Sequence, residues 1–328
     1  MTELQLNDII EKFSCGKLDI HQTLNLLSSN KKDFSNITFN QHESEAKKEL
    51  NNLIGLTEVK NLIDEYINYL QIQQIRSTYN LKNNCPVMHM IFKGNPGTGK
   101  TTVARLMGKI FSDYGFLKKG QFVETERAEL VGEYIGHTAK KTKEYIEKAL
   151  GGVLFIDEAY SLARGGTKDF GREAIDTLVK GMEKYKNELV VILAGYKEEM
   201  KCFLKTNPGL KSRFAINLNF PDYTSKELLQ IAELMFKKRE YILNQNNKHY
   251  MYNMIKKMKN RENIKKGNAR MIRNLVEKTI RKQANRIFKN KENLTRKKIM
   301  TINKKDLSRG GKEIINDHLS GYRTSKCW

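Results

Sequence analysis

The sequence predicts an α/β fold, in which a parallel sheet is covered by helices on both faces and is followed by a smaller helical domain. Between residues 87 and 218, short apolar segments alternate with amphipathic helical patterns. Such alternation is typical of parallel sheets with two buried faces. From residue 224 to residue 289 only helical periodicity remains. Pro221, between these two regions, is a natural hinge.

The predicted elements follow one another in a simple order. Residues 1–30 indicate two short amphipathic helices, and the polar residues 31–45 indicate a linker. A long helix begins near Glu58, because apolar residues recur at helical spacing up to Leu70. The strand candidates that follow are short apolar runs at 87–93, 122–124, 153–156, 189–193 and 216–218.

These elements suggest four regions along the chain. We expect an N-terminal helical hairpin with its linker, an α/β domain, a helical lid that ends with a helix from Lys305, and a flexible tail. The expected boundaries are 1–45, 46–222, 223–310 and 311–328.

A glycine-rich segment joins the first predicted strand to the next helix. It reads Gly94-Asn95-Pro96-Gly97-Thr98-Gly99-Lys100-Thr101, with Thr102 next in the chain. The pattern G-x-x-x-x-G-K-[ST] is that of a phosphate-binding P-loop, whose backbone N–H groups point at one anionic centre. Lys100 is expected to reach the outer phosphates, and the Thr101 hydroxyl is expected to hold Mg²⁺. The bound ligand is therefore predicted to carry phosphate groups.

Two acidic residues follow the third strand candidate. The apolar run 152–156 ends in Asp157 and Glu158, at the edge of a parallel sheet where ligands bind. Asp157 can hold Mg²⁺ directly or through water. Glu158 can orient and deprotonate an attacking water molecule, which is the step that separates hydrolysis from binding.

Composition narrows the class of protein. Of the 328 residues, 39% are hydrophobic and 29% are charged, and no apolar run approaches the about 18 residues that span a bilayer. The N-terminus lacks the pattern of a secretory signal. The four cysteines are far apart and lack metal-binding spacing, so we expect reduced thiols in a cytoplasmic protein.

The basic excess lies in the C-terminal part. The formal net charge is +3 over residues 1–230 and +19 over residues 231–328, which gives +22 for the chain. Such a surface can attract nucleic acid, an acidic protein or an anionic membrane. We favour a solvated helical surface instead, because the basic residues are scattered and lack interleaved aromatic residues for base stacking.

Several motifs together resemble those of the AAA+ ATPases, and within them the group of stage V sporulation protein K and the CbbX-type Rubisco activases. The resemblance runs from about Leu53 to Leu307. It rests on the P-loop and on five further segments, which are 54–56 (IGL), 130–139 (LVGEYIGHTA), 155–162 (FIDEAYSL), 207–214 (NPGLKSRF) and 220–223 (FPDY). The resemblance implies a five-stranded parallel sheet with a helical lid, which agrees with the pattern above.

The resemblance also implies roles for residues that the sequence alone would leave as ordinary. Ile54 and Gly55 match the segment that contacts adenine. Arg213 stands where the family has its arginine finger, which acts on the nucleotide of the neighbouring subunit, and Arg270 matches the sensor 2 arginine of the lid. Many AAA+ proteins have Asn or Thr at the end of the fourth strand, whereas this chain has Ala194-Gly195-Tyr196. The sensor 1 role is therefore left unassigned.

Tyr134-Ile135-Gly136 resembles the pore loop with which ring-shaped AAA+ proteins grip a polypeptide. An aromatic ring contacts any side chain by area, and a glycine lets the loop move. The alternative is a tyrosine packed against its own domain.

Our leading hypothesis is an Mg²⁺-dependent ATPase that assembles as a ring, expected to be a hexamer, and remodels a protein partner in connection with sporulation. Two alternatives remain open. One is a nucleic-acid-associated AAA+ ATPase that uses the basic lid. The other is an assembly switch that binds ATP without sustained turnover.

Overall fold

The structure is a computed structural model that describes residues 44–82, 87–134, 136–164, 169–214, 216–260, 267–289 and 294–324. The helical hairpin expected at residues 1–30 and nearly all of its linker lie outside these residues. So does Ile135 of the expected pore loop.

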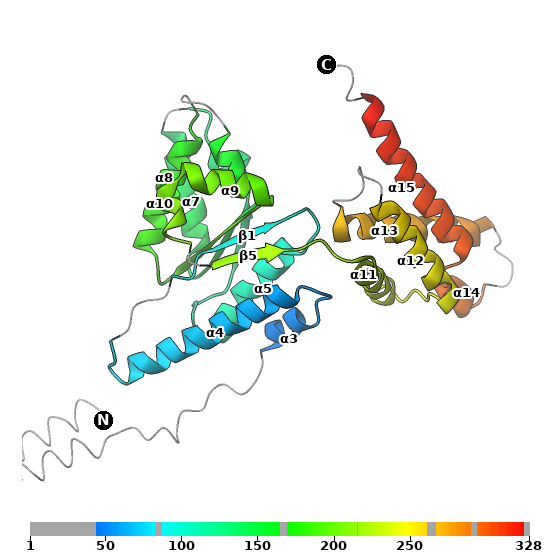
Figure 1. Cartoon of the computed structure of the whole chain (residues 1–328), viewed down its shortest axis with the longest axis horizontal. Helices are drawn as coiled ribbons and strands as arrows, with labels where there is room; N and C mark the ends of the chain where they lie inside the picture. Colours follow the sequence, from blue (N-terminus) through cyan, green and yellow to red (C-terminus); the bar gives the residue numbers. More distant parts are fainter. Residues whose placement is uncertain are drawn as a thin grey trace, which may run out of the picture. The chain divides into compact units, whose positions relative to one another are not determined.

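The described strands form one parallel sheet of five strands in the order β2-β3-β4-β1-β5 (Figure 1). The strands are β1 (Met90–Gly94), β2 (Phe122–Thr125), β3 (Gly152–Ile156), β4 (Leu189–Gly195) and β5 (Ile216–Phe220). The register sets Met90 of β1 opposite Ile192 of β4 and Ile216 of β5. The predicted α/β fold class is thus confirmed.

Alternate residues of the central strands bury their side chains on opposite faces of the sheet. Phe92 belongs to the hydrophobic cluster on one face, whereas its neighbour Ile91 belongs to the cluster on the other. Both faces are covered, which is why these strands read as continuous apolar runs. Strand β1, which pairs with β4 on one side and β5 on the other, ends at Gly94, where the P-loop begins.

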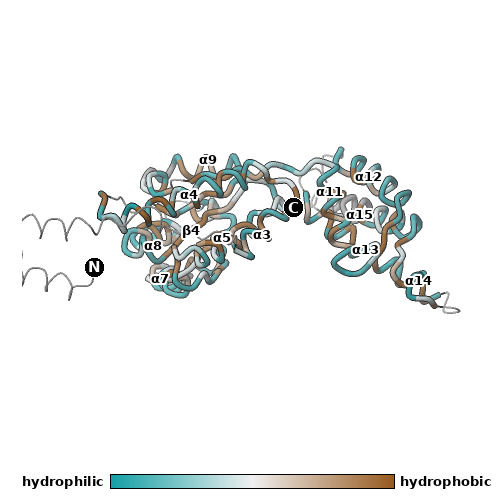
Figure 2. The backbone as a smooth tube through the Cα atoms, turned by 90° about the horizontal axis from the view of Figure 1, so that it is seen from below, coloured by the Kyte–Doolittle hydropathy of each residue, from teal (hydrophilic) through white to brown (hydrophobic). Residues whose placement is uncertain are grey.

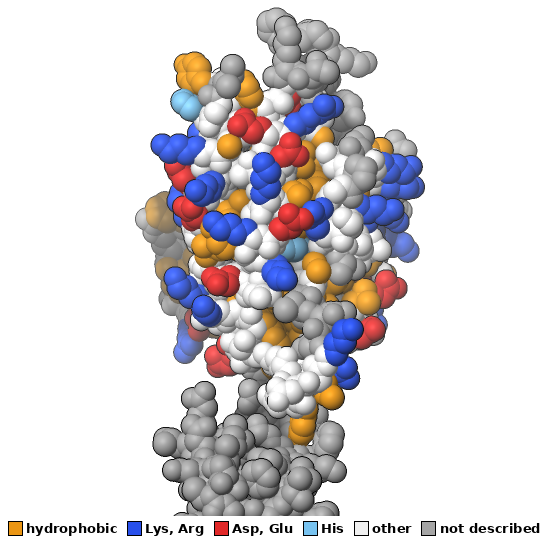
Figure 3. Space-filling view, turned by 90° about the vertical axis from the view of Figure 1, so that its left-hand side faces the viewer, with side chains coloured by type: hydrophobic (Ala, Val, Ile, Leu, Met, Phe, Trp, Pro, Cys, Tyr) orange, Lys and Arg blue, Asp and Glu red, His pale blue; other side chains and the backbone are white. Residues whose placement is uncertain are grey.

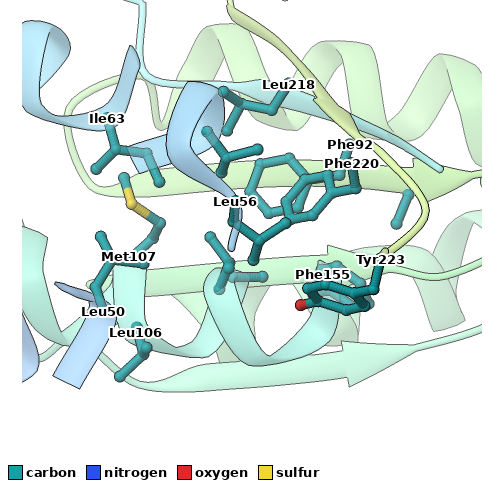
Figure 4. Packing of buried hydrophobic residues seen from close by; sticks show 14 of the residues in the cluster. Leu50, Leu56, Ile63, Phe92, Leu106, Met107, Phe155, Leu218, Phe220 and Tyr223 are labelled. Carbon is teal, nitrogen blue, oxygen red and sulfur yellow. The ribbon is translucent and has the colours of Figure 1, made fainter. Parts of the chain in front are cut away.

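Helices α3 (Glu45–Asn51), α4 (Thr57–Thr78) and α5 (Lys100–Asp113) contribute to the cluster around Phe92. Figure 4 shows Leu50, Ile63 and Met107 from these helices on one side of this cluster and Phe92 and Phe220 on the other, with Leu56 between them. The ring centroids of Phe92 and Phe220 are 4.9 Å apart. The same cluster extends through Tyr223 into the helical region that follows.

The opposite face is covered by α7 (His137–Ala149), α8 (Gly171–Lys184) and α9 (Lys197–Thr206). Along the helices on either face, hydrophobic and hydrophilic residues alternate, as the colours of Figure 2 show for α4 on one face and α8 on the other. This pattern is expected of helices that pack one side against a sheet.

The C-terminal region is helical, as predicted. It contains α11 (Ser225–Lys237), α12 (Gln245–Lys259), α13 (Asn268–Lys289), α14 (Arg296–Met300) and α15 (Lys304–Thr324). Thr224 begins α11 with a capping box, in which its hydroxyl accepts from the Glu227 N–H and the Glu227 carboxylate accepts from the Thr224 N–H. No helix among the described residues is long and apolar enough to cross a membrane.

The expected tail from residue 311 needs correction, because α15 continues as a helix to Thr324. Gly310 and Gly311 disfavour a helix by propensity, but here they are points of close packing. A Cβ at Gly310 would lie 2.9 Å from the Thr279 hydroxyl, and one at Gly311 would collide with Met254. The glycines therefore let α15 approach α13 and α12.

Candidate functional site

A hollow of about 620 Å³ lies at the carboxyl end of the sheet. The strand order brings the ends of β1, β4 and β3 side by side, so the segments that follow these strands meet there. The hollow is lined by the P-loop, the two acids after β3, the residues at the end of β4 and the start of α13: Pro96, Gly97, Gly99, Lys100, Thr101, Thr102, Arg105, Glu126, Asp157, Glu158, Gly195, Tyr196, Ala269, Arg270 and Arg273.

The P-loop has the backbone conformation that its glycines allow. Gly97 and Gly99 have φ angles of 71° and 99°, in the left-handed region that side chains disfavour. Lys100 is the first residue of α5, so the helix begins where phosphate would sit. The Lys100 ammonium donates to the carbonyls of Gly94 and Asn95, both at 2.9 Å.

Burial lowers the pKa of Lys100, and the nearby charges of Asp157 and Glu158 partly oppose this shift. The ammonium is thus held away from bulk water beside two carboxylates. A phosphate group entering the hollow would add the negative charge that a desolvated ammonium favours.

The two acids after β3 are fixed by the backbone. The Asp157 N–H donates to the Thr125 carbonyl at 3.0 Å, which continues the pairing of β3 with β2. One carboxylate oxygen of Asp157 accepts from the Glu158 N–H at 2.9 Å. Glu158 has φ 45° and ψ 41°, a left-handed conformation that costs about 1 kcal/mol or more in a residue with a side chain. Such strain is typical of functional positions.

Two tyrosines next to Glu158 were not assigned from the sequence. Tyr196 lines the hollow at the end of β4, and the Tyr160 ring lies 5.8 Å from the Tyr196 ring. Burial and then the charge of Glu158 raise the pKa of both hydroxyls, so both remain neutral donors. The sequence feature that could have indicated Tyr196 as a site residue is its position directly after a buried central strand.

Arg270 lies in the hollow, in the first turn of α13. Arg273 lines the hollow as well, although no role was expected for it from the sequence. Its spacing of three residues from Arg270, which aligns side chains on one helical face, was the available signal.

Ile54 and Gly55 do not line this hollow. They border a different one, of about 600 Å³, together with α11 and residues around Tyr241. Gly55 lies against the Glu227 carboxylate. The following residue, Leu56, would lie 3.5 Å from a Cβ at Gly99, so the two segments are neighbours without sharing a hollow.

Arg213 also lies outside the P-loop hollow. Its guanidinium pairs with the Glu183 carboxylate and donates to the Gly209 carbonyl. Its Nε atom is buried and lacks a hydrogen-bond partner among the described residues. The structure therefore brings Lys100, Thr101, Asp157, Glu158 and Arg270 together and leaves Arg213 apart.

Tyr134 is 66% exposed. Its ring meets the His137 ring edge-on at 5.5 Å, and its carbonyl accepts from the His137 N–H. Gly136, with φ 80°, precedes the first residue of α7. The loop thus presents an aromatic side chain to solvent at the start of a helix.

Solved structures share the fold. The AAA domain of FIGL-1 with ADP has a TM-score of 0.56 at 17% identity, over 84% of this chain and 92% of that one. A mutant of Thermotoga maritima RuvB has a TM-score of 0.55 at 19% identity, over 81% and 72% of the two chains. At this identity the likeness concerns the fold alone.

Sequence comparisons are more specific. Residues 90–222 match the family described as "ATPase family associated with various cellular activities (AAA)", and residues 224–315 match the AAA lid domain. Stage V sporulation protein K of Bacillus subtilis is 51% identical over 80% of this chain and 82% of its own length. A CfxQ homolog of Galdieria sulphuraria is 46% identical over 78% of this chain and 84% of its own.

The chloroplastic ribulose bisphosphate carboxylase/oxygenase activase of Cyanidioschyzon merolae is 43% identical over 78% of this chain and 87% of its own length. The chain therefore belongs to the AAA+ ATPases, in the group that includes stage V sporulation protein K and the CfxQ proteins.

Proposed function

We propose that this ATPase assembles as a ring, expected to be a hexamer, and couples ATP hydrolysis to the remodelling of a protein partner. The observation that carries the proposal is the place of Arg213, outside the hollow that gathers Lys100, Asp157, Glu158 and Arg270. An arginine finger that acts on a neighbour must lie away from its own P-loop. Such a finger accelerates turnover by roughly 10³ to 10⁵, so an isolated subunit should be nearly inactive.

The residues in the hollow fit Mg²⁺ and ATP. The Thr101 hydroxyl and the Asp157 carboxylate, which both line it, are the hard oxygen ligands that Mg²⁺ prefers. No cluster of three or more His, Cys, Asp or Glu residues suited to a metal occurs in the described part of the chain. Phosphate oxygens and water would therefore complete the shell. Bound Mg²⁺ would neutralise phosphate charge, while Lys100 binds phosphate and Glu158 takes a proton from water.

Glu158→Gln tests the hydrolytic part of this proposal. The variant should bind ATP normally and lose turnover, because a carboxamide cannot accept the proton of water. Glu65→Gln, on the exposed side of α4, is the matched control and should hydrolyse ATP at the normal rate. Sustained turnover by Glu158→Gln would show that Glu158 does not take the proton from the attacking water. Normal turnover by the parent chain also excludes the alternative of a pure assembly switch.

Tyr134→Ala tests the remodelling part. The exposed ring is suited to grip an extended polypeptide by contact area. The variant should keep ATP hydrolysis and lose the ability to unfold or extract a tagged partner, whereas Tyr69→Ala, an exposed tyrosine on α4, should keep both. Normal remodelling by Tyr134→Ala would show that the loop does not grip the partner.

We also propose that the partner acts in sporulation in the cytoplasm. The support is the 51% identity to a protein named stage V sporulation protein K, together with the spacing of the cysteines. Deletion of the gene in its host should lower the yield of heat-resistant spores, and Glu158→Gln should fail to restore it. An unchanged spore yield would contradict the assignment.

A second candidate function is nucleic-acid binding by the lid. One hollow there is lined by Lys282, Asn285, Arg286, Lys289, Arg309, Lys312 and Glu313, and concentrated positive charge attracts phosphate. Figure 3 shows the side of the α/β domain and not the lid, and there basic and acidic side chains are interspersed. Retention on DNA that weakens steeply with salt would favour this candidate, and no retention at low salt would eliminate it.

A further inference from the structure

The carbonyl groups of the P-loop are held from outside by the lid and by the segment that leads to it. We propose that Asp222 is a positioning residue for ATP hydrolysis, because it joins Asn95 of the P-loop to Asn268 at the start of α13. Through this junction Asp222 sets the place of Arg270. The inference uses the ATPase activity of the family and the proposed role of Arg270.

A P-loop that turns its N–H groups towards phosphate must turn its carbonyls the other way, and buried carbonyls need donors. In this chain the carbonyl of each residue from 94 to 98 accepts a hydrogen bond. The Lys100 ammonium donates to the carbonyls of Gly94 and Asn95. The donors for the next three carbonyls come from beyond the sheet: the Asn268 amide for Pro96 at 3.3 Å, the Ala269 N–H for Gly97 at 3.0 Å, and the Tyr223 hydroxyl for Thr98 at 3.2 Å.

Asp222 ties these donors to the loop itself. Its two carboxylate oxygens accept from the Asn95 amide at 2.9 Å and 3.0 Å. One of them also accepts from the Asn268 amide at 2.8 Å. The amide oxygen of Asn268 in turn accepts from the Tyr223 N–H at 3.0 Å. Hydrogen bonds to a charged acceptor are about twice as strong as those between neutral groups.

The P-loop packs closely against the start of α13, so that neither can move far without breaking the hydrogen bonds between them. A Cβ at Gly97 would lie 2.7 Å from the Gly267 carbonyl oxygen and 2.8 Å from the Arg270 nitrogen. Asn268 itself has φ 41°, a left-handed conformation that is held by hydrogen bonds with Pro96, Asp222 and Tyr223. A lid that rotates away must therefore release the backbone of the P-loop, and a P-loop that shifts on binding phosphate must pull on the start of α13.

Asp222 therefore affects the position of Arg270, since it binds Asn268 and only Ala269 separates Asn268 from Arg270. Asp222 does not line the hollow and need not touch nucleotide. It acts through the position of the loop and of Arg270. Its loss should therefore affect the same step as loss of Arg270.

The test is a double-mutant cycle on the full-length assembled protein, with kcat and KM for ATP and the Kd for fluorescent ADP. Asp222→Ala should lower kcat/KM about tenfold, as expected for loss of hydrogen bonds to a charged group. Asp222→Asn should recover most of this loss, because its amide oxygen still accepts from Asn268. Asp176→Ala, an exposed carboxylate on α8, should leave all three constants unchanged.

The cycle is completed by Arg270→Ala and by the double variant. The double variant should be no worse than Arg270→Ala within about twofold, because residues that act through one another are not additive. Losses that multiply, or unchanged kinetics in Asp222→Ala, would overturn the proposal. If Arg270→Ala is silent, the assumed role of Arg270 fails. In that case weaker ADP binding by Asp222→Ala still supports the anchoring of the P-loop, and unchanged binding refutes it.

Hydrogen exchange gives a readout that does not depend on activity. The Ala269 amide, which donates to the Gly97 carbonyl, should exchange about tenfold faster in Asp222→Ala, while amides in the middle of α13 keep their rates. Equal protection of Ala269 in the parent and the variant would contradict the proposal even if the variant were less stable.

Discussion

Acid should destabilise the α/β domain because His89 must take up a proton when the chain unfolds. His89 is 3% exposed, and its Nδ1 atom accepts from the Val191 N–H at 3.1 Å. Burial lowers its pKa from 6.5 to about 4, although a hydrogen bond with the backbone of Met182 opposes the shift. The neutral ring therefore belongs to the folded state.

The sign and size follow from this shift. Between pH 6.5 and pH 4 the unfolded chain binds the proton and the folded chain does not, so the stability present above pH 6.5 is lost as the pH falls. With these two pKa values, the loss from His89 is about 2 kcal/mol at pH 5 and about 3 kcal/mol at pH 4. Carboxylates add their own pH dependence, so a comparison with a variant is required.

His89→Gln is the appropriate variant, because an amide oxygen can accept from the Val191 N–H but does not titrate. Urea unfolding, followed by far-UV circular dichroism, should be measured from pH 7.5 to pH 4 for both proteins. The difference in their unfolding free energies should change in favour of the variant by about 2 kcal/mol between pH 7.5 and pH 5. Parallel pH profiles would refute the reasoning.

Three further predictions concern the P-loop, the Tyr196 hydroxyl near Glu158, and the lid. Gly97→Ala should weaken ADP binding by about tenfold or more in a fluorescence titration. The reason is that the new Cβ would meet the backbone of Gly267 and that φ at this position is positive. Equal affinity of the variant and the parent would argue against the close approach of the lid to the P-loop. Tyr196→Phe keeps the ring and removes the hydroxyl. It should lower kcat for ATP about tenfold with little change in KM, as expected for the loss of one hydrogen bond to the reacting groups. An unchanged kcat would show that this hydroxyl takes no part in the reaction. Arg286→Ala leaves the carboxylate of Asp306, which is 1% exposed, without its bidentate partner at 2.9 Å. This change should cost about 3–5 kcal/mol in lid stability, measured by chemical denaturation. A loss below about 1 kcal/mol would show that the lid does not depend on this ion pair.

The parts of the site that could be predicted from the sequence are those that lie within one short segment. The P-loop and the Asp157-Glu158 pair carry their chemistry in adjacent residues, and the strands that position them have apolar runs. The parallel arrangement then requires that their carboxyl ends meet. The hollow could therefore be expected from the sequence alone.

Contacts between distant segments could not be predicted in this way. Asn95 and Asp222 are joined across 127 residues of chain, and neither residue type alone signals a partner. The Gly310-Gly311 pair shows the same limit, because only the packing of α13 and α12 explains glycines inside a helix. Helix propensity describes a residue in its own segment, and here tertiary contact outweighs it.

The central claim, a hydrolytic site shared between neighbouring subunits, is tested most directly by mixing two inactive variants. Glu158→Gln keeps Arg213 and Arg213→Ala keeps Glu158, so each variant supplies what the other lacks. Mixed as monomers before assembly, they should regain ATP turnover at up to about a quarter of the parent rate, because about that fraction of interfaces is intact. A mixture no more active than its two components, or full turnover by Arg213→Ala alone, would contradict the claim.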